Sequence, residues 1–288
     1  MSTHPAQAAL TATLSAHPRR VVACSGGVDS LLLAAVAHEA APATTVVAHS
    51  VTPAVPEAAT ERVRRTAGEL GWHLVLVDSP EFDDERYLAN PVDRCFFCKT
   101  NLYDELERIV ADLPQAHAGW TLLSGANTDD LGEYRPGLLA AAEHAVRHPY
   151  VEAGLGKADI RALAGDRGHA WHQLPAAPCL ASRLYTGTPV TPGLVRAVEA
   201  GEAMATRLTG EQVLRTRVRD DVVLLELPAA TRHRVDERVL GAVLTVMRRH
   251  APHLRRTELD PEPYAPGRSF VGAPQPVSLG LPLTRVGG

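Results

Sequence analysis

The chain has 288 residues, of which 45% are hydrophobic and 22% are charged, and its formal net charge at pH 7 is −4. The acidic balance counts against a large nucleic-acid surface, because phosphate backbones are bound by clustered lysine and arginine. Four cysteines are too few for a secreted disulfide scaffold. No stretch approaches about 18 uninterrupted apolar residues, so we expect a soluble, cytoplasmic protein with reduced thiols and no membrane partner.

The first 173 residues alternate between strand and helix patterns. The expected strands cover residues 20–24, 44–50, 74–77 and 120–124. The expected helices cover residues 6–16, 29–40, 57–71, 99–112, 136–146 and 157–168. Helices between successive strands predict an α/β fold, with a parallel sheet covered on both faces and ligands bound beyond the carboxyl ends of its strands.

A smaller α+β domain is predicted after residue 173. Its expected elements are a proline-bearing loop at residues 174–193, helices at 192–208 and 232–250, a hairpin of strands at 213–218 and 222–227, and a strand at 256–259. We expect the domains to cover residues 1–173 and 174–271, the second serving substrate binding or oligomerisation. Residues 272–288 are predicted to be a flexible tail.

The residues between the first expected strand and its helix form an anion-binding loop. Gly26 and Gly27 lack a Cβ, so their backbone N–H groups can approach phosphate oxygens. The helix that starts near Asp29 adds the positive end of its dipole, and Ser25 and Ser30 add hydroxyl donors. Asp29 would repel phosphate unless it binds Mg²⁺ or caps the helix. The loop has no lysine and is therefore not a Walker A motif.

This loop, S-G-G-V-D-S, resembles the signature of the PP-loop ATP pyrophosphatases. The resemblance implies that the loop holds the pyrophosphate of ATP while a nucleophile attacks the α-phosphorus and an adenylate forms. The ATP-binding residues it implies are Ser25, Gly26, Gly27, Val28, Asp29 and Ser30. An ordinary βα turn with N-cap serines is the competing interpretation, but all six positions match the signature.

Two polar residues follow the fourth expected strand and reach the same edge of the sheet. Asn127 and Asp129 can contact the nucleotide or a metal from there. Alternatively, they form an Asx turn with N-cap carboxylates before the next helix.

Three cysteines form a candidate thiol site. Cys95 and Cys98 have C-x₂-C spacing just before an expected helix, and Cys179 lies in the proline-bearing loop. The helix N-terminus, together with Arg94 and Lys99, is expected to lower the pKa of the paired thiols and favour thiolates.

Several kinds of thiol site fit this spacing. A thioredoxin-like redox pair uses Cys95 and Cys98 alone. A structural zinc site needs four ligands and must borrow His172 or Cys24, although Cys24 is expected to be a buried apolar residue. Three cysteines by themselves suit a [4Fe–4S] cluster with one iron left open, which is the interpretation we favour over the others and over no site at all.

Six segments carry a more specific resemblance. They are SGGVDS, NPVDRCFFCK, SGANTDDLGEYRPG, VEAGLGKADIRALA, PCLASR and VLRTRV. Their order resembles the ATP-dependent sacrificial sulfur transferases of the nickel-pincer nucleotide pathway, the LarE family, over residues 19–270. Some members carry only the cysteine of PCLASR and give up its sulfur, leaving dehydroalanine. Members with the C-x₂-C pair are thought to bind a [4Fe–4S] cluster with a transferable sulfide, and this chain is similar to them.

The resemblance implies a reaction in two steps. ATP adenylates a carboxylate of a pyridinium mononucleotide and releases pyrophosphate, and sulfur from the thiol site then displaces AMP to give a thiocarboxylate. Mg²⁺ would neutralise the pyrophosphate through Asp29. The implied metal ligands of the cluster are Cys95, Cys98 and Cys179. The family resemblance also implies a homo-oligomer.

Arginines in the second domain are candidates for binding the phosphate of the substrate. Arg215 and Arg217 are two residues apart on an expected strand, so their side chains lie on one face. The resemblance implies that they bind the phosphate dianion together with Arg183, and that Glu202 and Glu226 lie near that site. The competing interpretations are a solvated strand face and, for Arg183, a surface ion pair.

Three other functions remain open. Some PP-loop enzymes thiolate tRNA with a three-cysteine cluster, although the acidic chain has no visible RNA-binding module. An amidating ligase would use ammonia in place of sulfide. A non-catalytic nucleotide or metal sensor would bind ATP without releasing pyrophosphate.

Overall fold

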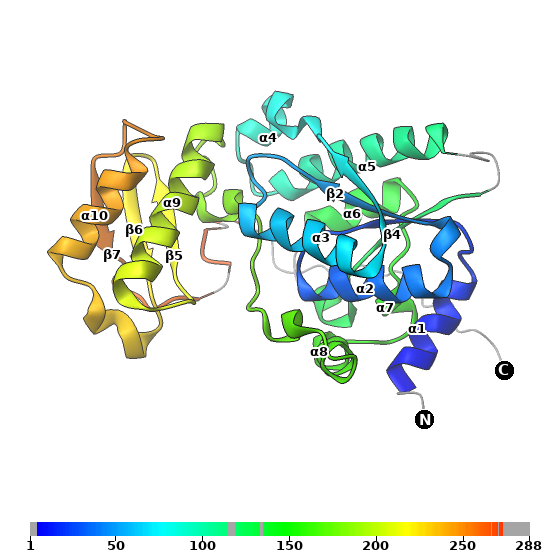
Figure 1. Cartoon of the computed structure of the whole chain (residues 1–288). Coiled ribbons are helices and arrows are strands. Elements are labelled where there is room, and N and C mark those ends of the chain that lie inside the picture. Colours follow the sequence, from blue (N-terminus) through cyan, green and yellow to red (C-terminus); the bar gives the residue numbers. More distant parts are fainter. Residues whose placement is uncertain (1–4, 114–118, 133–134, 266, 270, 273–288) are drawn as a thin grey trace.

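A parallel sheet forms the centre of the N-terminal part of the molecule (Figure 1). The computed structural model describes residues 5–113, 119–132, 135–265, 267–269 and 271–272. The four strands have the order β3-β2-β1-β4 and are all parallel, which confirms the predicted α/β fold. They are β1 (Arg20–Ala23), β2 (Thr45–Ser50), β3 (His73–Val77) and β4 (Thr121–Ser124).

Helices cover both faces of this sheet because alternate strand residues point to opposite sides. Val22 packs with Val47 and Leu123 on one face, whereas Val21 packs with Val46 on the other. The first face is covered by α1 (Pro5–Ser15), α2 (Val28–Ala40), α3 (Glu57–Leu70), α7 (Pro149–Glu152) and α8 (Lys157–Asp166). The second is covered by α5 (Arg94–Asp112) and α6 (Pro136–Glu143), and α4 (Glu85–Leu88) precedes them.

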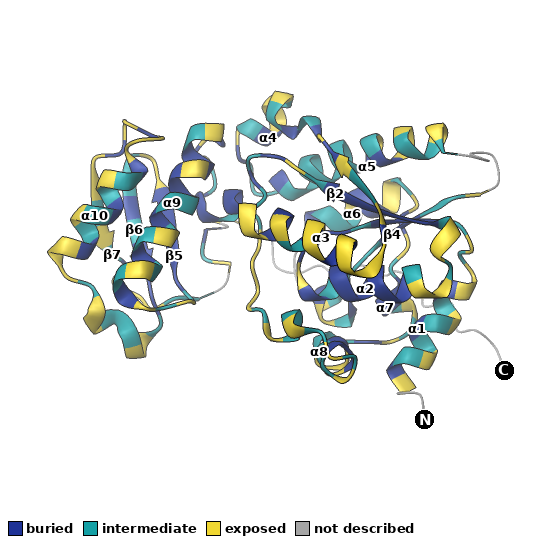
Figure 2. Cartoon of the chain, viewed as in Figure 1, coloured by how far each residue is buried: buried dark blue, intermediate teal, exposed yellow. Residues whose placement is uncertain are grey.

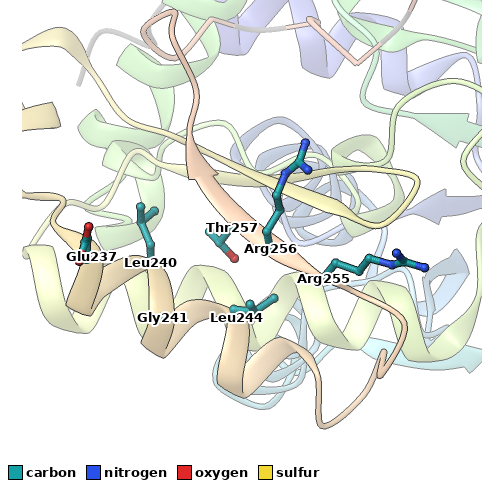
Figure 3. Close-up of a pocket in the computed structure, with 7 residues that line it drawn as sticks. All are labelled: Glu237, Leu240, Gly241, Leu244, Arg255, Arg256 and Thr257. Atoms are coloured by element: carbon teal, nitrogen blue, oxygen red, sulfur yellow. The ribbon is translucent and has the colours of Figure 1, made fainter.

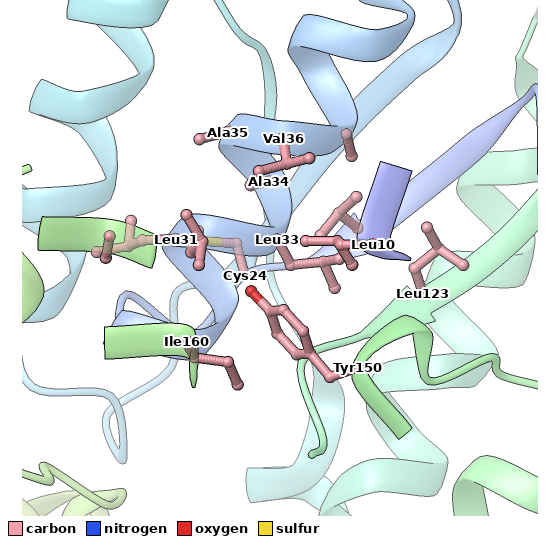
Figure 4. Packing of buried hydrophobic residues seen from close by; sticks show 14 of the residues in the cluster. Leu10, Cys24, Leu31, Leu33, Ala34, Ala35, Val36, Leu123, Tyr150 and Ile160 are labelled. Atoms are coloured by element: carbon pink, nitrogen blue, oxygen red, sulfur yellow. The ribbon is translucent and has the colours of Figure 1, made fainter. Parts of the chain in front are cut away.

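The helix that follows the anion-binding loop is the most deeply buried of these elements. Figure 2 shows α2 almost entirely in the colour of buried residues. Leu31 and Leu33 contribute to the core that Figure 4 shows, and Tyr150 of α7 packs into the same core. A helix that is apolar around its whole circumference must be enclosed, so α2 holds the loop at its N-terminus in a fixed place.

A second, smaller sheet lies in the C-terminal part. Its strands β5 (Arg215–Arg219), β6 (Val222–Glu226) and β7 (Arg256–Leu259) have the order β5-β6-β7. The hairpin of β5 and β6 is antiparallel as predicted, and β7 is parallel to β6. The helices α9 (Pro192–Thr209) and α10 (Glu237–Met247) pack against each other beside this sheet (Figure 1).

The start of α10 differs from the predicted one, which lay at residue 232. The Asp236 side chain accepts a hydrogen bond from the Val239 backbone N–H at 2.9 Å and caps the helix there. Residues 229–234 form a separate 3₁₀ turn. A capping carboxylate inside a helical pattern is therefore what sets this boundary.

Residues from both parts meet at the junction between the two sheets. Leu180 donates its backbone N–H to the Ala54 carbonyl at 2.8 Å, and Ala54 and Tyr87 belong to the hydrophobic core of the C-terminal part. We retain the division into residues 1–173 and 174–271 as a proposal, in which this shared core is the domain interface. The predicted tail falls, from residue 273 onward, outside the described residues. None of the helices in the described ranges has the length and apolar content needed to cross a membrane.

Replacing Leu33 with alanine should lower the free energy of unfolding by about 2–5 kcal/mol, because a cavity would be left in an enclosed core. Leu33 is fully buried, whereas Leu139 of α6 is 43% exposed. Leu139→Ala is the matched control and should change stability by about 0.5 kcal/mol or less. Urea unfolding followed by circular dichroism measures both, and equal losses would contradict this account of α2.

Candidate functional site

The anion-binding loop has a backbone that only glycine adopts without strain. Gly26 has φ +80°, and a Cβ there would lie 2.9 Å from the Ala59 carbonyl oxygen of α3. Gly27 is the N-cap of α2 and makes no side-chain capping bond. Within the described ranges the N-cap residue thus leaves the first N–H groups of α2 uncapped, and the loop can offer them to an anion.

The two serines of the loop act mainly on the loop itself. The Ser30 hydroxyl accepts the Ser25 backbone N–H at 3.1 Å and donates to the Gly27 carbonyl at 3.1 Å. It also lies 3.2 Å from the Ser25 hydroxyl. Ser30 is buried, whereas Ser25 and Gly27 are exposed. Ser30 thus fixes the turn, and Ser25 and Gly27 face the solvent where a ligand can reach them.

Two carboxylates lie beside the loop. The Asn127 side-chain amide donates to Asp29 Oδ2 at 3.2 Å, so β4 and the loop meet at the sheet edge as predicted. Burial and then the neighbouring Asp130 raise the pKa of Asp29, whereas Lys157 and Arg161 act in the opposite direction. Asp29 makes no ion pair among the described residues, and its carboxylate is the kind of hard oxygen ligand that Mg²⁺ takes.

Asp129 and Asp130 are adjacent in the chain but lie in different surroundings. Asp129 is exposed, and its carboxylate accepts the Lys157 backbone N–H at 2.6 Å, at the start of α8. Its role with ATP remains a prediction. Asp130 is buried and makes ion pairs of 3.0 Å with Lys157 and Arg135. Sequence reasoning missed Asp130, because nothing in an Asp-Asp pair shows which member turns inward.

The paired cysteines lie inside a helix, not before it as predicted. The helix α5 begins at Arg94, so Cys95 is in its first turn and Cys98 is at the start of its second. Cys179 comes just before the 3₁₀ turn Leu180–Arg183. Cys98 and Cys179 both pack against the core at the junction of the two sheets, so the fold brings the thiols from both parts of the chain to one place.

The expectation of lowered thiol pKa values is wrong. Burial raises the pKa of Cys95 and of Cys98, and Cys179 raises both further. Lys99 lowers both, and Arg94 lowers that of Cys95. Desolvation therefore exceeds the effect of the nearby cations. Since Cys179 acts on both members of the pair, its thiol lies near Cys95 and Cys98 in the folded chain.

The spacing of the thiols argues against a preformed zinc site. In the described ranges, one group of three ligating side chains has all its ligand atoms within 4.8 Å, namely Asp104, Glu107 and His144. It includes neither the three thiols nor His172 or Cys24. A [4Fe–4S] cluster binds each thiolate to a different iron, so it does not require the thiols to lie as close together as a zinc ion does.

The remaining cysteine belongs to the anion-binding loop. Cys24 is buried as predicted, and its thiol lies 3.8 Å from the Ser30 hydroxyl. Burial raises the pKa of Cys24 to about 11. It therefore packs as a neutral thiol beneath the loop.

The Arg183 side chain holds the backbone next to Cys179. Its guanidinium forms a bidentate pair with Glu202 at 2.9 and 3.0 Å. Another nitrogen donates to the carbonyls of Pro178 and Cys179 at 2.6 and 3.1 Å. This arrangement fixes the backbone at Cys179, and phosphate binding by Arg183 remains a prediction.

The two strand arginines lie on one face of β5 and are both buried. Arg217 pairs with Glu226 at 2.8 Å, and Glu226 also accepts from Arg268 at 3.0 Å. Arg215 donates to the Ala176 carbonyl and lies 5.2 Å from the ring of Tyr264. Burial and then Arg183 lower the pKa of Arg215. The solvated-face interpretation is thus wrong for this strand.

A groove of about 270 Å³ lies between α10 and β7 (Figure 3), with Leu240, Leu244 and Thr257 in its lining. Its lining contains none of the predicted site residues. We assign it no part in the chemistry.

Besides Asp130, sequence reasoning missed Glu81 and Arg62. Glu81 is buried beside Cys98, whose pKa it raises, and Arg62 donates to the Gly26 carbonyl at 2.7 Å. Both lie in segments that carry no motif, a 3₁₀ turn and a helix rich in surface charges. Their positions beyond the carboxyl ends of β3 and β2 are the one signal that could have selected them.

Together, the parallel sheet, the uncapped glycine loop at its carboxyl edge and the flanking carboxylates define an α/β protein of the PP-loop class, with a thiol-bearing junction to a second unit. Comparison with known proteins gives the family.

The pyridinium-3,5-bisthiocarboxylic acid mononucleotide synthase of Lactiplantibacillus plantarum is 31% identical over 228 residues, which are 78% of this chain and 80% of the relative. This chain therefore belongs to the LarE family. An uncharacterized protein of Synechocystis is 35% identical over 73% of the chain and 76% of its own length. An uncharacterized protein of Methanocaldococcus jannaschii is 28% identical over 50% and 53%. No protein-family model matches the chain.

The raised pKa values predict slow alkylation of the paired thiols. In the reduced, metal-free protein, the rates for Cys95 and Cys98 with iodoacetamide should keep rising with pH beyond 9, because the thiolate fraction is still growing. A free cysteine, with a pKa of about 8.5, levels off near there. Peptide mass spectrometry resolves the two sites, with a short unstructured cysteine peptide, blocked at both ends, in the same mixture as the reference. An alkylation rate that stops rising below pH 8 at either site would show that the nearby cations lower the thiol pKa more than burial raises it.

Proposed function

We propose that this protein is an ATP-dependent sulfur transferase that converts a carboxylate of a pyridinium mononucleotide to a thiocarboxylate. The observation that carries the proposal is the shared position of the anion-binding loop and the thiols. The Asp29 carboxylate meets Asn127 just beyond β4, and Cys179 is anchored next to Ala54, beyond β2. Activation and sulfur delivery would therefore occur at one edge of one sheet. The L. plantarum relative, named for a bisthiocarboxylic product, supports this substrate class.

The loop would carry the activation step. A carboxylate oxygen of the substrate attacks the α-phosphorus of ATP, the bond to the bridging oxygen breaks, and pyrophosphate leaves with the electron pair. The backbone N–H groups of the loop around Gly27 and of the first residues of α2 would bind the phosphate oxygens. Asp29 would hold Mg²⁺, which neutralises pyrophosphate charge. The product is an acyl-adenylate, whose AMP is a good leaving group.

The thiols would carry the sulfur. Cys95, Cys98 and Cys179 would hold a [4Fe–4S] cluster, which supplies a transferable sulfide for displacement of AMP. Arg94 and Lys99 compensate the negative charge of the thiolates, since the thiols raise the pKa of both cations. Arg183 holds the backbone at Cys179.

Arg215 is our first choice for the phosphate of the mononucleotide. Arg183 and Arg217 are each paired with a carboxylate, Glu202 and Glu226. Among the residues that the structure describes, Arg215 donates hydrogen bonds to carbonyls, lies against the Tyr264 ring and makes no ion pair. The carboxylate that acts on its charge, Glu202, is already paired with Arg183, so a bound dianion would stabilise this buried guanidinium. We also propose, from the family resemblance, that the protein is a cytoplasmic homo-oligomer.

Asp29→Asn should reduce pyrophosphate release by about a hundredfold or more, since neutralising phosphate charge contributes several kcal/mol. The assay uses Mg²⁺-ATP and a pyridinium mononucleotide dicarboxylate. Asp112→Asn, at the exposed last residue of α5, is the control and should behave like the unmodified protein. Pyrophosphate release at an unchanged rate in Asp29→Asn would exclude the proposed role of this carboxylate.

Anaerobic reconstitution tests the cluster. We expect about four irons per chain and absorption near about 400 nm, both lost in Cys95→Ala, Cys98→Ala and Cys179→Ala. Cys24→Ala is the matched control, because this buried thiol lies under the loop, and it should keep its iron. Iron retained without Cys179, or zinc in its place, would contradict a three-thiol cluster.

A further inference from the structure

The N-terminal half of α3 forms one wall of the anion-binding loop. Ala59 and Val63 are the residues that a Cβ on Gly26 would meet, at 2.9–3.2 Å. From the same part of α3, Arg62 reaches the loop and donates from one guanidinium nitrogen to the Gly26 carbonyl at 2.7 Å. The loop therefore has a cation attached to its own backbone.

This cation has no counter-ion in the described part of the chain. The Gly26 carbonyl is the one acceptor that Arg62 contacts there, and no carboxylate oxygen lies within 4.0 Å of its guanidinium. Arg183 and Arg217, in contrast, are each paired with a glutamate. Burial and then Arg65 lower the pKa of Arg62, so the charge is held in an unfavourable place. An anion would relieve this cost.

We propose that Arg62 is a further substrate-binding residue, which contacts the β- and γ-phosphates of ATP and stays with them as pyrophosphate leaves. The loop lacks the lysine that serves these phosphates in a Walker A motif, and Arg62 supplies a positive charge in its stead. The nitrogens not bonded to Gly26 are available for two phosphate oxygens. The guanidinium stabilises the charge that pyrophosphate acquires when its bond to the α-phosphorus breaks. This inference rests on the proposed use of ATP.

Arg62 also has a simpler possible role, as a brace that only holds Gly26 in place. The two roles differ in which ligands they affect. A brace supports the whole loop and therefore matters equally for AMP and ATP, whereas a contact to the outer phosphates matters for ATP and pyrophosphate alone.

Binding of Mg²⁺-ATP, inorganic pyrophosphate and AMP to the full chain, measured by titration calorimetry, separates these roles. Arg62→Gln should weaken ATP and pyrophosphate about 10- to 100-fold and change AMP about twofold or less. Arg62→Lys should lose less affinity for ATP and pyrophosphate than Arg62→Gln does, because lysine keeps the positive charge but lacks the paired N–H donors of the guanidinium. Arg65→Gln is the control, since its side chain is 68% exposed and lies one turn further along α3.

Each other outcome overturns the proposal in a recognisable way. Equal losses for AMP and ATP would mean that Arg62 is only a brace, and unchanged affinities would mean that it touches no phosphate. In both cases the unmodified protein still binds ATP, so the proposed function stands. Absence of ATP binding by the unmodified protein would overturn the proposed function together with this inference. Circular dichroism of each variant checks that the fold is kept.

Discussion

The contact between Gly26 and α3 is the constraint on which the site depends. A backbone with φ +80° and no space for a Cβ beside the Ala59 carbonyl brings the loop directly against the helix. This close approach positions the uncapped start of α2 and lets Arg62 reach the loop carbonyl. Helix α2 is buried along most of its length, so its packing against the sheet holds the loop at its N-terminus in a fixed position relative to the strands.

The arginines of the candidate site differ in whether a carboxylate compensates their charge. Arg183 and Arg217 are buried with glutamate partners, which satisfies them but leaves them less free to bind a ligand. Arg62 and Arg215 lack such partners among the described residues and adjoin, respectively, the loop and the carbonyl of Ala176. The described residues thus contain buried arginines that are paired with a glutamate and arginines that donate to carbonyls without an ion pair.

The strands of the sheet could be predicted from the sequence, because the spacing of apolar residues and the positions of glycines are properties of short segments. The strands at the centre, the antiparallel hairpin and the loop at residues 25–30 agree with the structure. Burial of individual charges was not predictable. The helix dipole and Arg94 suggested a lowered pKa for Cys95, but burial in the folded chain raises it instead. The inward turn of Asp130 likewise depends on the position of Lys157, 27 residues further on.

The thiols depend on the junction between the units. Asn90, with φ +53°, accepts from Arg94 and donates to the carbonyls of Tyr185 and Thr188 at 2.8 and 2.7 Å. The start of α5, which carries two thiols, is thereby tied to the loop that follows the third. Any relative movement of the units would change the spacing of the thiols before it changed the nucleotide loop. Sulfur delivery is therefore the step of the proposed reaction most directly coupled to how the two units pack.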